Sequence, residues 1–312
     1  MINGLNLLFQ FLDSFAFIVL AAAGLAIIFG IMGVINLAHG EFIMVGAYAT
    51  TLVATGTGAP LPVAMVAGVL VTAVFGLLVE RTIVSGALPN RLFERTLGWP
   101  VIDPLYDRLA DSMVATWGLS LVMIQGTRIV FGDSLAQVGT PFGSVAYGEF
   151  SYSIYRILLS GVSLVVLGVV YWIFTHTDYG MRARATIQNE EMARSLGVDT
   201  ERTYMTTFAI GSALAGLTGA LYAPVLTMVP GLGGSFLVEA FVAVVVGGPS
   251  VVIGTTLAGG LLGAINAFFS NLFGTFFGRI ALLVTAIVMI RFLPDGITGF
   301  VDRLRQRRQE VS

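Results

Sequence analysis

The chain has 312 residues, of which 56% are hydrophobic and only 11% are charged. An ordinary soluble domain is about 25% charged, so this composition excludes a soluble globular protein and indicates a surface that faces lipid. The net charge of −2 excludes a basic face for nucleic acid. The absence of cysteine excludes disulfides, thiolate metal sites and cysteine nucleophiles.

Lysine is absent, so all 16 basic residues are arginines. A P-loop needs a lysine that reaches the phosphates. We therefore expect neither an ATP site nor another cofactor here, and ATP could drive the protein only through a second polypeptide. No arginine precedes Arg81, so the N-terminus lacks the cationic start of a cleavable signal peptide. The first apolar run is expected to be a retained transmembrane helix.

Hydropathy predicts about eight membrane segments, because a helix needs about 20 apolar residues to cross the hydrocarbon core. Six runs have this length. They are 15–35, 61–79, 112–131, 154–174, 204–226 and 279–293. Two further apolar stretches, 42–55 and 236–270, are interrupted by glycine, proline or polar residues. The predicted fold class is all-α: a polytopic transmembrane helix bundle with some broken segments, forming a single domain over 1–312.

The distribution of arginine predicts the orientation. Segments 81–110, 175–203 and the tail 300–312 carry four arginines each, and loops rich in arginine stay in the cytoplasm. We therefore expect these three segments to be cytoplasmic. Segment 132–153 has no arginine and is predicted to be an external loop of turn or strand character. Parity then places the N-terminus outside, unless a part of 36–55 is re-entrant.

The segment from Gly33 to Glu41 interrupts an apolar region with an amide, an imidazole and a carboxylate. Asn36, His39 and Glu41 would lie inside the membrane or at its edge, where polar groups usually face a bundle interior or a wet cavity. Together with Gly40, they predict a helix break whose freed amides point at a pathway. The break either stands beside the pathway or contacts the solute directly. An interfacial turn capped by Asn36 is the alternative.

A second interruption repeats this pattern later in the chain. Residues 24–54 and 209–248 both read as a helix, a break and an apolar run. The second break contains Gly231, Gly233 and Gly234. Paired breaks in two halves point to a central substrate path, although glycine-rich membrane sequences also look alike by chance. Glu239 follows the second break and either lines the path or lies in the outer interface. One histidine and one carboxylate two residues apart form a poor metal site, so no metal is expected.

The segment 177–198 differs from its apolar surroundings. It alternates in charge, contains good helix formers and reaches Gly197, a suitable C-cap. Ala185, Met192, Ala193 and Leu196 share one face at helical spacing. These features predict a short amphipathic cytoplasmic helix over 182–197. It is either a solvated connection or a contact through which a partner transmits force.

Five blocks, in this order, resemble the branched-chain amino acid permease family of ABC importers, which includes urea and short-chain amide permeases. The blocks are 36–40, 115–121, 182–197, 211–221 and 244–248. The resemblance spans nearly the whole chain, although each block alone is weak. It implies a non-catalytic permease domain, multi-pass in a bacterial plasma (inner) membrane. It also implies a second permease subunit, cytoplasmic ABC ATPase subunits and an extracytoplasmic solute-binding protein as partners.

The resemblance further implies that the 182–197 helix touches the ATPase. The residues that match the family pattern are Arg182, Arg184, Asn189, Glu190 and Gly197. We expect Arg194 to contribute to ATPase association together with Glu190. There are two departures from the family: the 81–110 loop is longer than expected, and Gly248-Pro249-Ser250 replaces another glycine-rich turn.

The solute stays open between branched-chain or other hydrophobic amino acids and urea or short-chain amides. Block 115–121 and the surroundings of Glu239 look slightly closer to the urea and amide branch. A function of a different class is a stand-alone ion-coupled transporter or channel, which would need a relay built from His39, Glu41 and Glu239. A membrane-embedded enzyme is disfavoured because no serine–histidine, paired-aspartate or histidine-rich motif lies within the spans.

Overall fold

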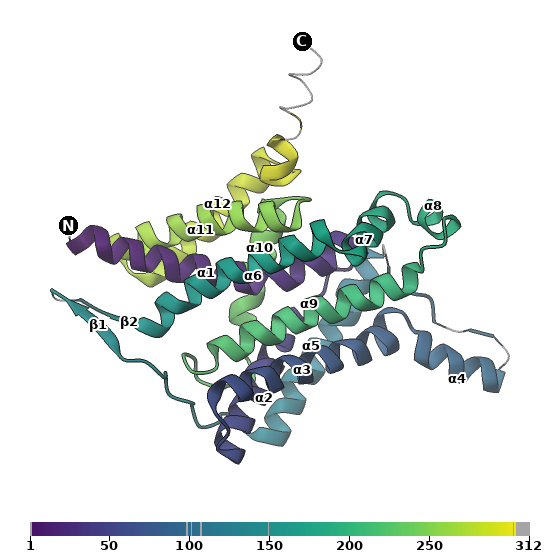
Figure 1. Cartoon of the computed structure of the whole chain (residues 1–312), viewed down its shortest axis with the longest axis horizontal. Helices are drawn as coiled ribbons and strands as arrows, with labels where there is room; N and C mark the ends of the chain where they lie inside the picture. The colour runs from purple at the N-terminus through teal and green to yellow at the C-terminus, as the bar shows by residue number, and fades with distance from the viewer. Residues whose placement is uncertain are drawn as a thin grey trace, which may run out of the picture. The chain divides into compact units, whose positions relative to one another are not determined.

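A computed structural model of the chain describes residues 2–97, 99–100, 102–106, 108–148, 150–301 and 303. The predicted all-α class is confirmed: the regular structure of these residues is helical apart from one two-stranded hairpin (Figure 1). Of the predicted cytoplasmic tail 300–312, residues 302 and 304–312 lie outside the described residues.

The elements follow one another along the chain with short connections. In order they are α1 (Ile2–Met32), α2 (His39–Thr57), α3 (Leu61–Val79), the π-helical turn η1 (Glu80–Val84), α4 (Ala87–Leu97), α5 (Leu109–Phe131), β1 (Ser144–Tyr147), β2 (Phe150–Ser153), α6 (Ile154–His176), α7 (Asp178–Gln188), α8 (Glu190–Ser195), α9 (Thr200–Tyr222), α10 (Gly234–Gly247), α11 (Val251–Phe273) and α12 (Thr275–Phe292). The strand character expected within 132–153 is present as the β1–β2 hairpin.

Seven helices of the described chain are long and apolar enough to cross a membrane, namely α1, α3, α5, α6, α9, α11 and α12. The shorter apolar α10 and the more polar α2 accompany them. The interrupted segment 236–270 forms two helices rather than one broken span. Gly248, with φ of +83°, and Pro249 separate α10 from α11, because a left-handed residue followed by proline ends a helix.

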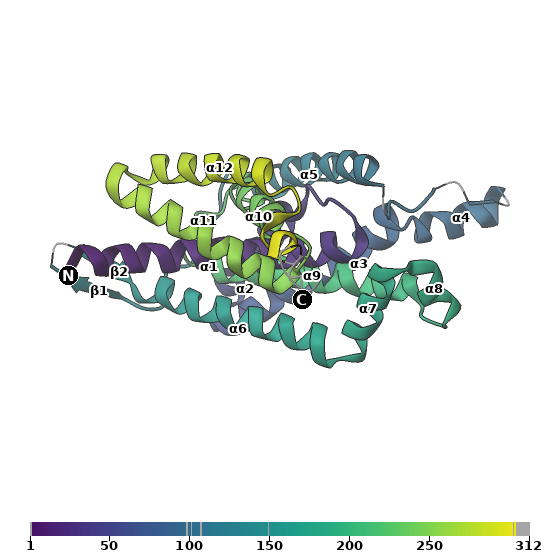
Figure 2. The ribbon, with the colours of Figure 1, turned by 90° about the horizontal axis from the view of Figure 1, so that it is seen from above.

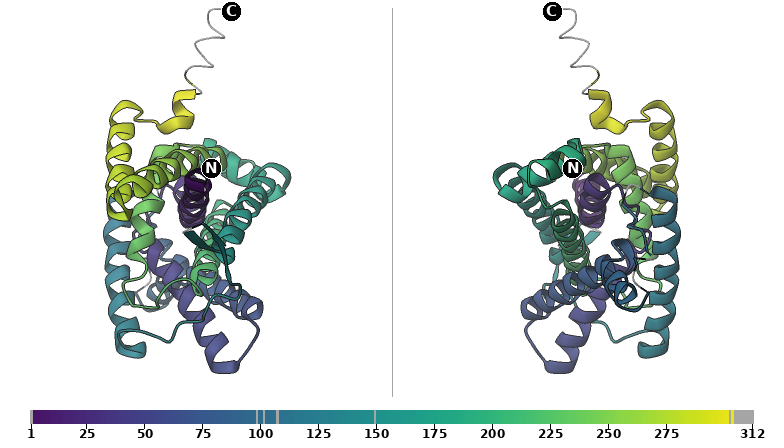
Figure 3. Two further views of the ribbon diagram at one scale, coloured as in Figure 1. Left: turned by 90° about the vertical axis from the view of Figure 1, so that its left-hand side faces the viewer. Right: turned by 90° about the vertical axis from the view of Figure 1, so that its right-hand side faces the viewer.

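The chain divides into two compact units. Unit 1 comprises Met1–Ala26, Gly139–Tyr171 and Val238–Ser312, and unit 2 comprises Ile27–Val138 and Trp172–Leu237. In unit 1, α11 and α12 lie side by side as an antiparallel pair, coloured light green to yellow in Figures 2 and 3. An ion pair of 2.6 Å between Asp13 and Arg156 joins α1 to α6. The single domain over 1–312 stays a prediction.

The core of unit 2 is a close packing of α2, α3 and α9. Glycines let these backbones approach, as small residues do between membrane helices. A Cβ placed at Gly46 would lie 2.6 Å from the Gly216 Cα, and one placed at Gly219 would lie 2.7 Å from the Ala47 nitrogen. The Phe42 ring fills the centre of this packing and is completely buried.

The 81–110 segment, expected to be a loop, contains a helix that the sequence analysis missed. After α3, the chain makes the π-helical turn η1 and then forms α4. In the views of Figures 1 and 2, α4, α7 and α8 lie at the end of unit 2 where α9 begins. The two arginine-rich segments 81–110 and 175–203 therefore meet at one end of this unit, in agreement with their predicted common side.

Candidate functional site

The first predicted break is present between α1 and α2, where residues 33–38 are not helical. Two hydroxyl groups of α5 satisfy its freed backbone groups. Ser112 Oγ accepts a hydrogen bond of 3.2 Å from Ile35 N. Thr116 Oγ1 accepts one of 3.0 Å from Leu37 N. Side-chain partners of this kind compensate for the helical hydrogen bonds that are missing where a membrane helix is interrupted. The hydroxyl groups of α5 therefore stabilise the non-helical conformation of the break.

The structure brings the second predicted break against the first. A Cβ placed at Gly40 would lie 2.6 Å from the Gly233 carbonyl carbon, and one placed at Gly233 would lie 2.7 Å from Glu41 N. Glycine is therefore required at both positions for the backbones to meet. Gly231 has open space around its Cβ direction, and so does Gly234, which begins α10.

Polar side chains of the first break are deeply buried. The Asn36 Oδ1 atom accepts a hydrogen bond of 3.0 Å from Ala38 N, and its Nδ2 atom has no hydrogen-bond partner among the described residues. The Glu41 carboxylate has a side-chain hydrogen bond with Ser120 of α5, whereas its Oε2 atom has none within the described chain. His39 is buried in the first turn of α2.

Helix α2 has two faces of different character. Ile43 and Ala47 lie against α9. Glu41 and Tyr48, seven residues apart, share the opposite face because of the helical period. The Tyr48 ring lies 5.6 Å from that of Phe131 in α5, and the buried Tyr48 hydroxyl also lacks a hydrogen-bond partner among the residues described. This face thus presents a carboxylate oxygen and a phenol that a ligand or water could bind.

Glu239 belongs to unit 1, where it forms an ion pair of 3.0 Å with Arg279 of α12. The glutamate is buried and the arginine is half exposed. Neither role expected for Glu239 anticipated this partner, because Arg279 lies 40 residues away in the sequence.

The single helix predicted over 182–197 is wrong in its form. The segment contains the end of α7 and the whole of α8, with Asn189 between them in an extended conformation (φ −161°, ψ 104°). Asn189 Oδ1 accepts a hydrogen bond of 2.8 Å from Met192 N. An asparagine that caps a new helix start competes with continuation of the previous helix, which explains the break.

The predicted C-cap at Gly197 is present. Its φ is +87°, and its amide donates a hydrogen bond of 3.0 Å to the Arg194 carbonyl. The outer surface of α7–α8 combines exposed charged, polar and apolar side chains. They are Met181, Arg182, Arg184, Ile187, Asn189, Met192, Arg194 and Leu196. Glu190 is half buried.

Glu190 points toward the start of α9 and collects several partners there. It forms an ion pair of 2.6 Å with Arg194, and its other oxygen accepts a hydrogen bond of 3.1 Å from Tyr204 OH. Thr200 donates to the first oxygen over 3.3 Å. Glu190 therefore ties α8 to α9 rather than facing outward.

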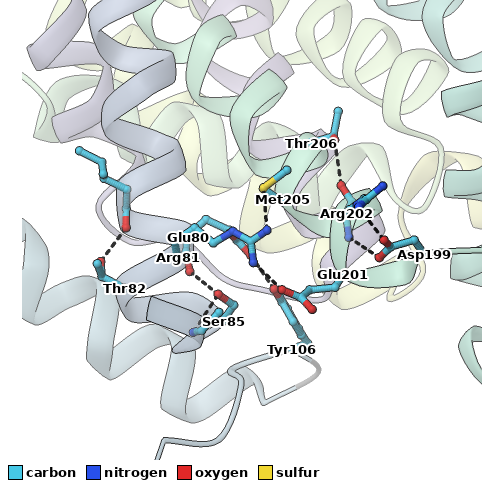
Figure 4. Close-up of polar contacts among 12 residues, drawn as sticks. Glu80, Arg81, Thr82, Ser85, Tyr106, Asp199, Glu201, Arg202, Met205 and Thr206 are labelled. Atoms are coloured by element: carbon cyan, nitrogen blue, oxygen red, sulfur yellow. Dashed lines mark hydrogen bonds and ion pairs between the residues drawn. The ribbon is translucent and has the colours of Figure 1, made fainter. Parts of the chain in front are cut away.

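This cluster continues to the end of α3 through aromatic and charged groups. The Tyr204 and Tyr106 rings are 4.5 Å apart. Tyr106 OH donates a hydrogen bond of 2.6 Å to the buried Glu80. Arg81 forms ion pairs with Glu80, over 3.6 Å, and with Glu201 (Figure 4). We call the six residues Glu80, Arg81, Tyr106, Glu190, Glu201 and Tyr204 the coupling network.

Burial, followed by the Glu80 carboxylate, raises the pKa of Tyr106 above its ordinary value, so the phenol stays a donor to Glu80. A cavity of about 240 Å³ lies beside the network, between Tyr106, Glu190 and Arg194. Sequence reasoning missed Glu80, Tyr106 and Tyr204. The only available signal was the Glu80-Arg81 charge pair at the end of an apolar run. Within the described part of the chain, no three His, Cys, Asp or Glu side chains form a metal site.

Comparisons with known proteins identify relatives over nearly the whole chain. The permease protein BraD of a high-affinity branched-chain amino acid transport system in Pseudomonas aeruginosa is 29% identical, over 90% of this chain and 91% of BraD. A probable branched-chain amino acid transport permease protein, LivH, of Methanocaldococcus jannaschii is 27% identical, over 93% of this chain and 91% of LivH. The autoinducer 2 import permease LsrC of Photorhabdus luminescens is 34% identical, over 32% of this chain and 31% of LsrC.

No solved structure matches the chain. The family model described as branched-chain amino acid transport system / permease component matches residues 7–293. With its seven candidate spans, the protein is a multi-pass transport permease of the inner membrane. The chain belongs to the family of branched-chain amino acid transport system permease components.

Proposed function

We propose that the chain is the permease subunit of an ABC importer that moves branched-chain or other hydrophobic amino acids into the cytoplasm, driven by separate ATPase subunits. One observation carries the proposal: the exposed α7–α8 segment is tied by Glu190 to the coupling network at the ends of α3 and α9. The names of the full-length relatives favour branched-chain amino acids over urea or amides. A second permease subunit and an extracytoplasmic solute-binding protein would complete the importer.

The ATPase would bind the outer surface of α7–α8. A short helix docks into a partner groove through apolar anchors at helical spacing, and Met192 and Leu196 are two exposed residues four positions apart on α8 and its end. Arg182 and Arg184 add exposed positive charge that carboxylates of the partner would pair. The predicted ATPase-coupling residues would thus have two different roles. The arginines of α7 would bind the ATPase, and Glu190 would connect α8 to the helix bundle.

Motion of α8 would reach the spans through the coupling network. Glu190 holds Tyr204, the Tyr204 ring packs on Tyr106, and Tyr106 holds Glu80. A displaced α8 would draw Glu190 away from Thr200 and Tyr204 of α9, so the network favours a joint movement of α8 and α9, which the contacts from Tyr204 to Tyr106 and Glu80 extend to α3. The π-helical turn η1 at Glu80 supports this role, because such turns are frequent at functional sites.

The solute pathway would run along the first break and the α2 face that carries Glu41. A zwitterionic amino acid has an ammonium group and a carboxylate. Glu41 Oε2 would accept from the ammonium, and Asn36 Nδ2 would donate to the carboxylate. Both atoms lack a hydrogen-bond partner among the described residues, and buried polar atoms without partners are costly unless a ligand or water binds them. The close contact of Gly40 with Gly233 would couple this site to the second break.

The alternative of a stand-alone ion-coupled transporter has weaker support. It would need a relay of titratable groups, and Glu239, one of its three candidate members, is engaged by Arg279. The other two, His39 and Glu41, lie in unit 2.

Copurification and reconstituted uptake test the proposal. The double variant Glu190→Ala/Arg194→Ala removes the tie between α8 and α9, so we expect loss of ATPase association and of ATP-driven uptake while the bundle still folds. The matched control is Arg202→Ala, which removes an exposed ion pair of 2.9 Å with Asp199 on the same segment and leaves the Asp199 cap of α9 in place. Unchanged complex yield and uptake in the first variant would contradict the coupling role. Uptake that runs on an ion gradient after ATP depletion would contradict the importer itself.

A further inference from the structure

Helix α4 lies outside the seven candidate spans, yet half of its surface is apolar. At 100° per residue, one half of the helix carries Leu88, Leu92, Phe93 and Leu97, and the other half carries Asn90, Arg91, Glu94 and Arg95. No described side chain of α4 is buried. Leu92 is 60% exposed, and Trp99, just beyond the helix, is 63% exposed. The segment is therefore an amphipathic helix whose leucines stay exposed among the described residues, while Phe93 is partly buried.

The chain keeps α4 close to the end of a span. Only Ser85 and Gly86 separate it from the span that ends at Val84, and two residues reach at most about 7 Å. Gly86 turns the chain there with φ of +64°. The row of exposed apolar side chains along α3, including Leu70, Val74 and Leu78, continues the lipid-facing surface up to this turn. The apolar face of α4 is thus held within reach of the bilayer surface.

The chain that follows α4 is tied back to the first turn of the helix and to the end of the span. Asn90 Nδ2 donates a hydrogen bond of 2.6 Å to the Ile102 carbonyl, and its Oδ1 accepts one of 2.9 Å from Ile102 N. The amide of Leu105 bonds the Val84 carbonyl over 2.8 Å. The chain after α4 is thereby folded back onto the helix and onto the end of the span. It cannot carry α4 away into solution without breaking these bonds.

We propose that α4 is an interfacial helix that lies in the membrane surface and binds anionic lipid. Leu88, Leu92 and Leu97 insert among the acyl chains, as the apolar side of such helices does. Trp99 takes the interfacial position that tryptophan favours. Arg91 and Arg95 contact the headgroup phosphates, which attract basic residues at an anionic surface.

A lipid surface fits α4 better than a protein partner does. The short connection through Ser85 and Gly86 keeps α4 beside the end of a span, and the arginines lie on the half that would point to the headgroups. Because Asn90 also holds the chain that leads to Tyr106, attachment of α4 to the membrane fixes the position from which Tyr106 contacts Glu80.

The absence of cysteine from the sequence makes site-directed spin labelling the direct test. Leu92→Cys places a nitroxide on the apolar half of α4, and Glu94→Cys places one on the polar half as the matched control. The full-length protein is reconstituted into nanodiscs of phosphatidylcholine with phosphatidylglycerol. We expect the label at 92 to be more accessible to oxygen than to a water-soluble nickel complex, and the label at 94 to show the reverse. Leu88→Cys provides a second reporter on the apolar half.

A second part of the experiment tests whether Arg91 and Arg95 bind anionic lipid. In the Leu92→Cys background, Arg91→Gln/Arg95→Gln should raise nickel accessibility when phosphatidylglycerol is present and change little in phosphatidylcholine alone. Equal aqueous accessibility at 88, 92 and 94 would overturn the proposal, since α4 would then stand in water. Protection of all three labels from both reagents would also overturn it, in favour of a covering protein. An insertion depth independent of phosphatidylglycerol and of the arginines would overturn the anionic preference.

Discussion

Two polar sites of unit 2 each bury a carboxylate, but they satisfy it differently. In the coupling network, Glu80 has a tyrosine donor and an arginine, and Glu190 has the same pair of partner types. At the first break, Glu41 has a serine partner, forms no ion pair among the described residues, and leaves one oxygen unused. Satisfied polar networks rigidify a structure, whereas partly satisfied ones mark places for a ligand or water. Under the proposed function, the first site transmits force and the second binds the solute.

The largest expected effect comes from removing the centre of the coupling network. Glu80→Ala deprives Tyr106 of its acceptor and Arg81 of one partner. A hydrogen bond to a buried charged group contributes about 1.5–3 kcal/mol, and we expect a loss of unfolding free energy in this range. Arg81 still forms its ion pair with Glu201 in this variant, so the loss of unfolding free energy should be smaller than if Arg81 were left without any partner. Chemical denaturation in nanodiscs measures it, and Tyr106→Phe, which removes only the hydroxyl, should lose less. Equal stability of Glu80→Ala and the wild type would refute the difference between the two sites.

A somewhat smaller effect is expected from the packing of α9 against α2. Gly219→Ala forces a methyl group against the backbone of Ile43 and Ala47, and overpacking of this kind costs about 1–3 kcal/mol. The control is Gly118→Ala in α5, where the added methyl group meets open space. It should be neutral or stabilising, because alanine is favoured over glycine in helices. Thermal unfolding of the two variants should shift in opposite directions or differ clearly in size.

A smaller, pH-dependent effect is expected at α7. Burial raises the pKa of Tyr179 to about 12, and its hydroxyl lies 2.7 Å from the Thr207 hydroxyl of α9. In the unfolded chain the phenol has the ordinary tyrosine pKa of about 10. The contribution of the neutral phenol is therefore complete below pH 10 and is lost as the pH rises toward 12. Tyr179→Phe should abolish this part of the pH dependence of unfolding, and an unchanged profile would disprove the assignment.

The smallest effect on stability is expected at the first break. Glu41→Gln keeps the shape and the Ser120 contact and replaces a partly unpaired carboxylate, so unfolding should be unchanged or slightly harder. Uptake should fall about tenfold, which corresponds to about 1.4 kcal/mol of lost solute interaction. A loss of stability as large as that of Glu80→Ala, with uptake preserved, would show that Glu41 stabilises the fold and does not bind the solute.

Some of this architecture was open to sequence reasoning and some was not. Apolar runs and glycines locate the spans and both breaks, because hydropathy and backbone freedom act locally. The contact of Gly40 with Gly233 depends on how α2 and the chain before α10 meet. The Tyr106 bond to Glu80 spans 26 residues, and the Arg81 bond to Met205 spans 124. No spacing rule encodes such pairs.

Two local errors had readable causes. Helix α4 was missed because a charged, proline-containing stretch was taken for a loop, although its leucines follow the helical period. A single helix was predicted over 182–197 because charged residues and good helix formers occur on both sides of Asn189. Asparagine followed by two glutamates is itself a helix-start signal, and it identifies α8 as a separate helix.

The proposed function depends above all on the binding of an ATP-hydrolysing partner to α7–α8. Photo-crosslinking from single cysteines tests it directly, since the chain supplies none of its own. A photoreactive label at Leu196→Cys, where the native side chain is 78% exposed, should link to the ATPase subunit in the purified importer complex. The same label at Val122→Cys, on the exposed side of α5, should link to lipid. A label at 196 that links only to lipid, or to a protein on the outer side of the membrane, would contradict the account.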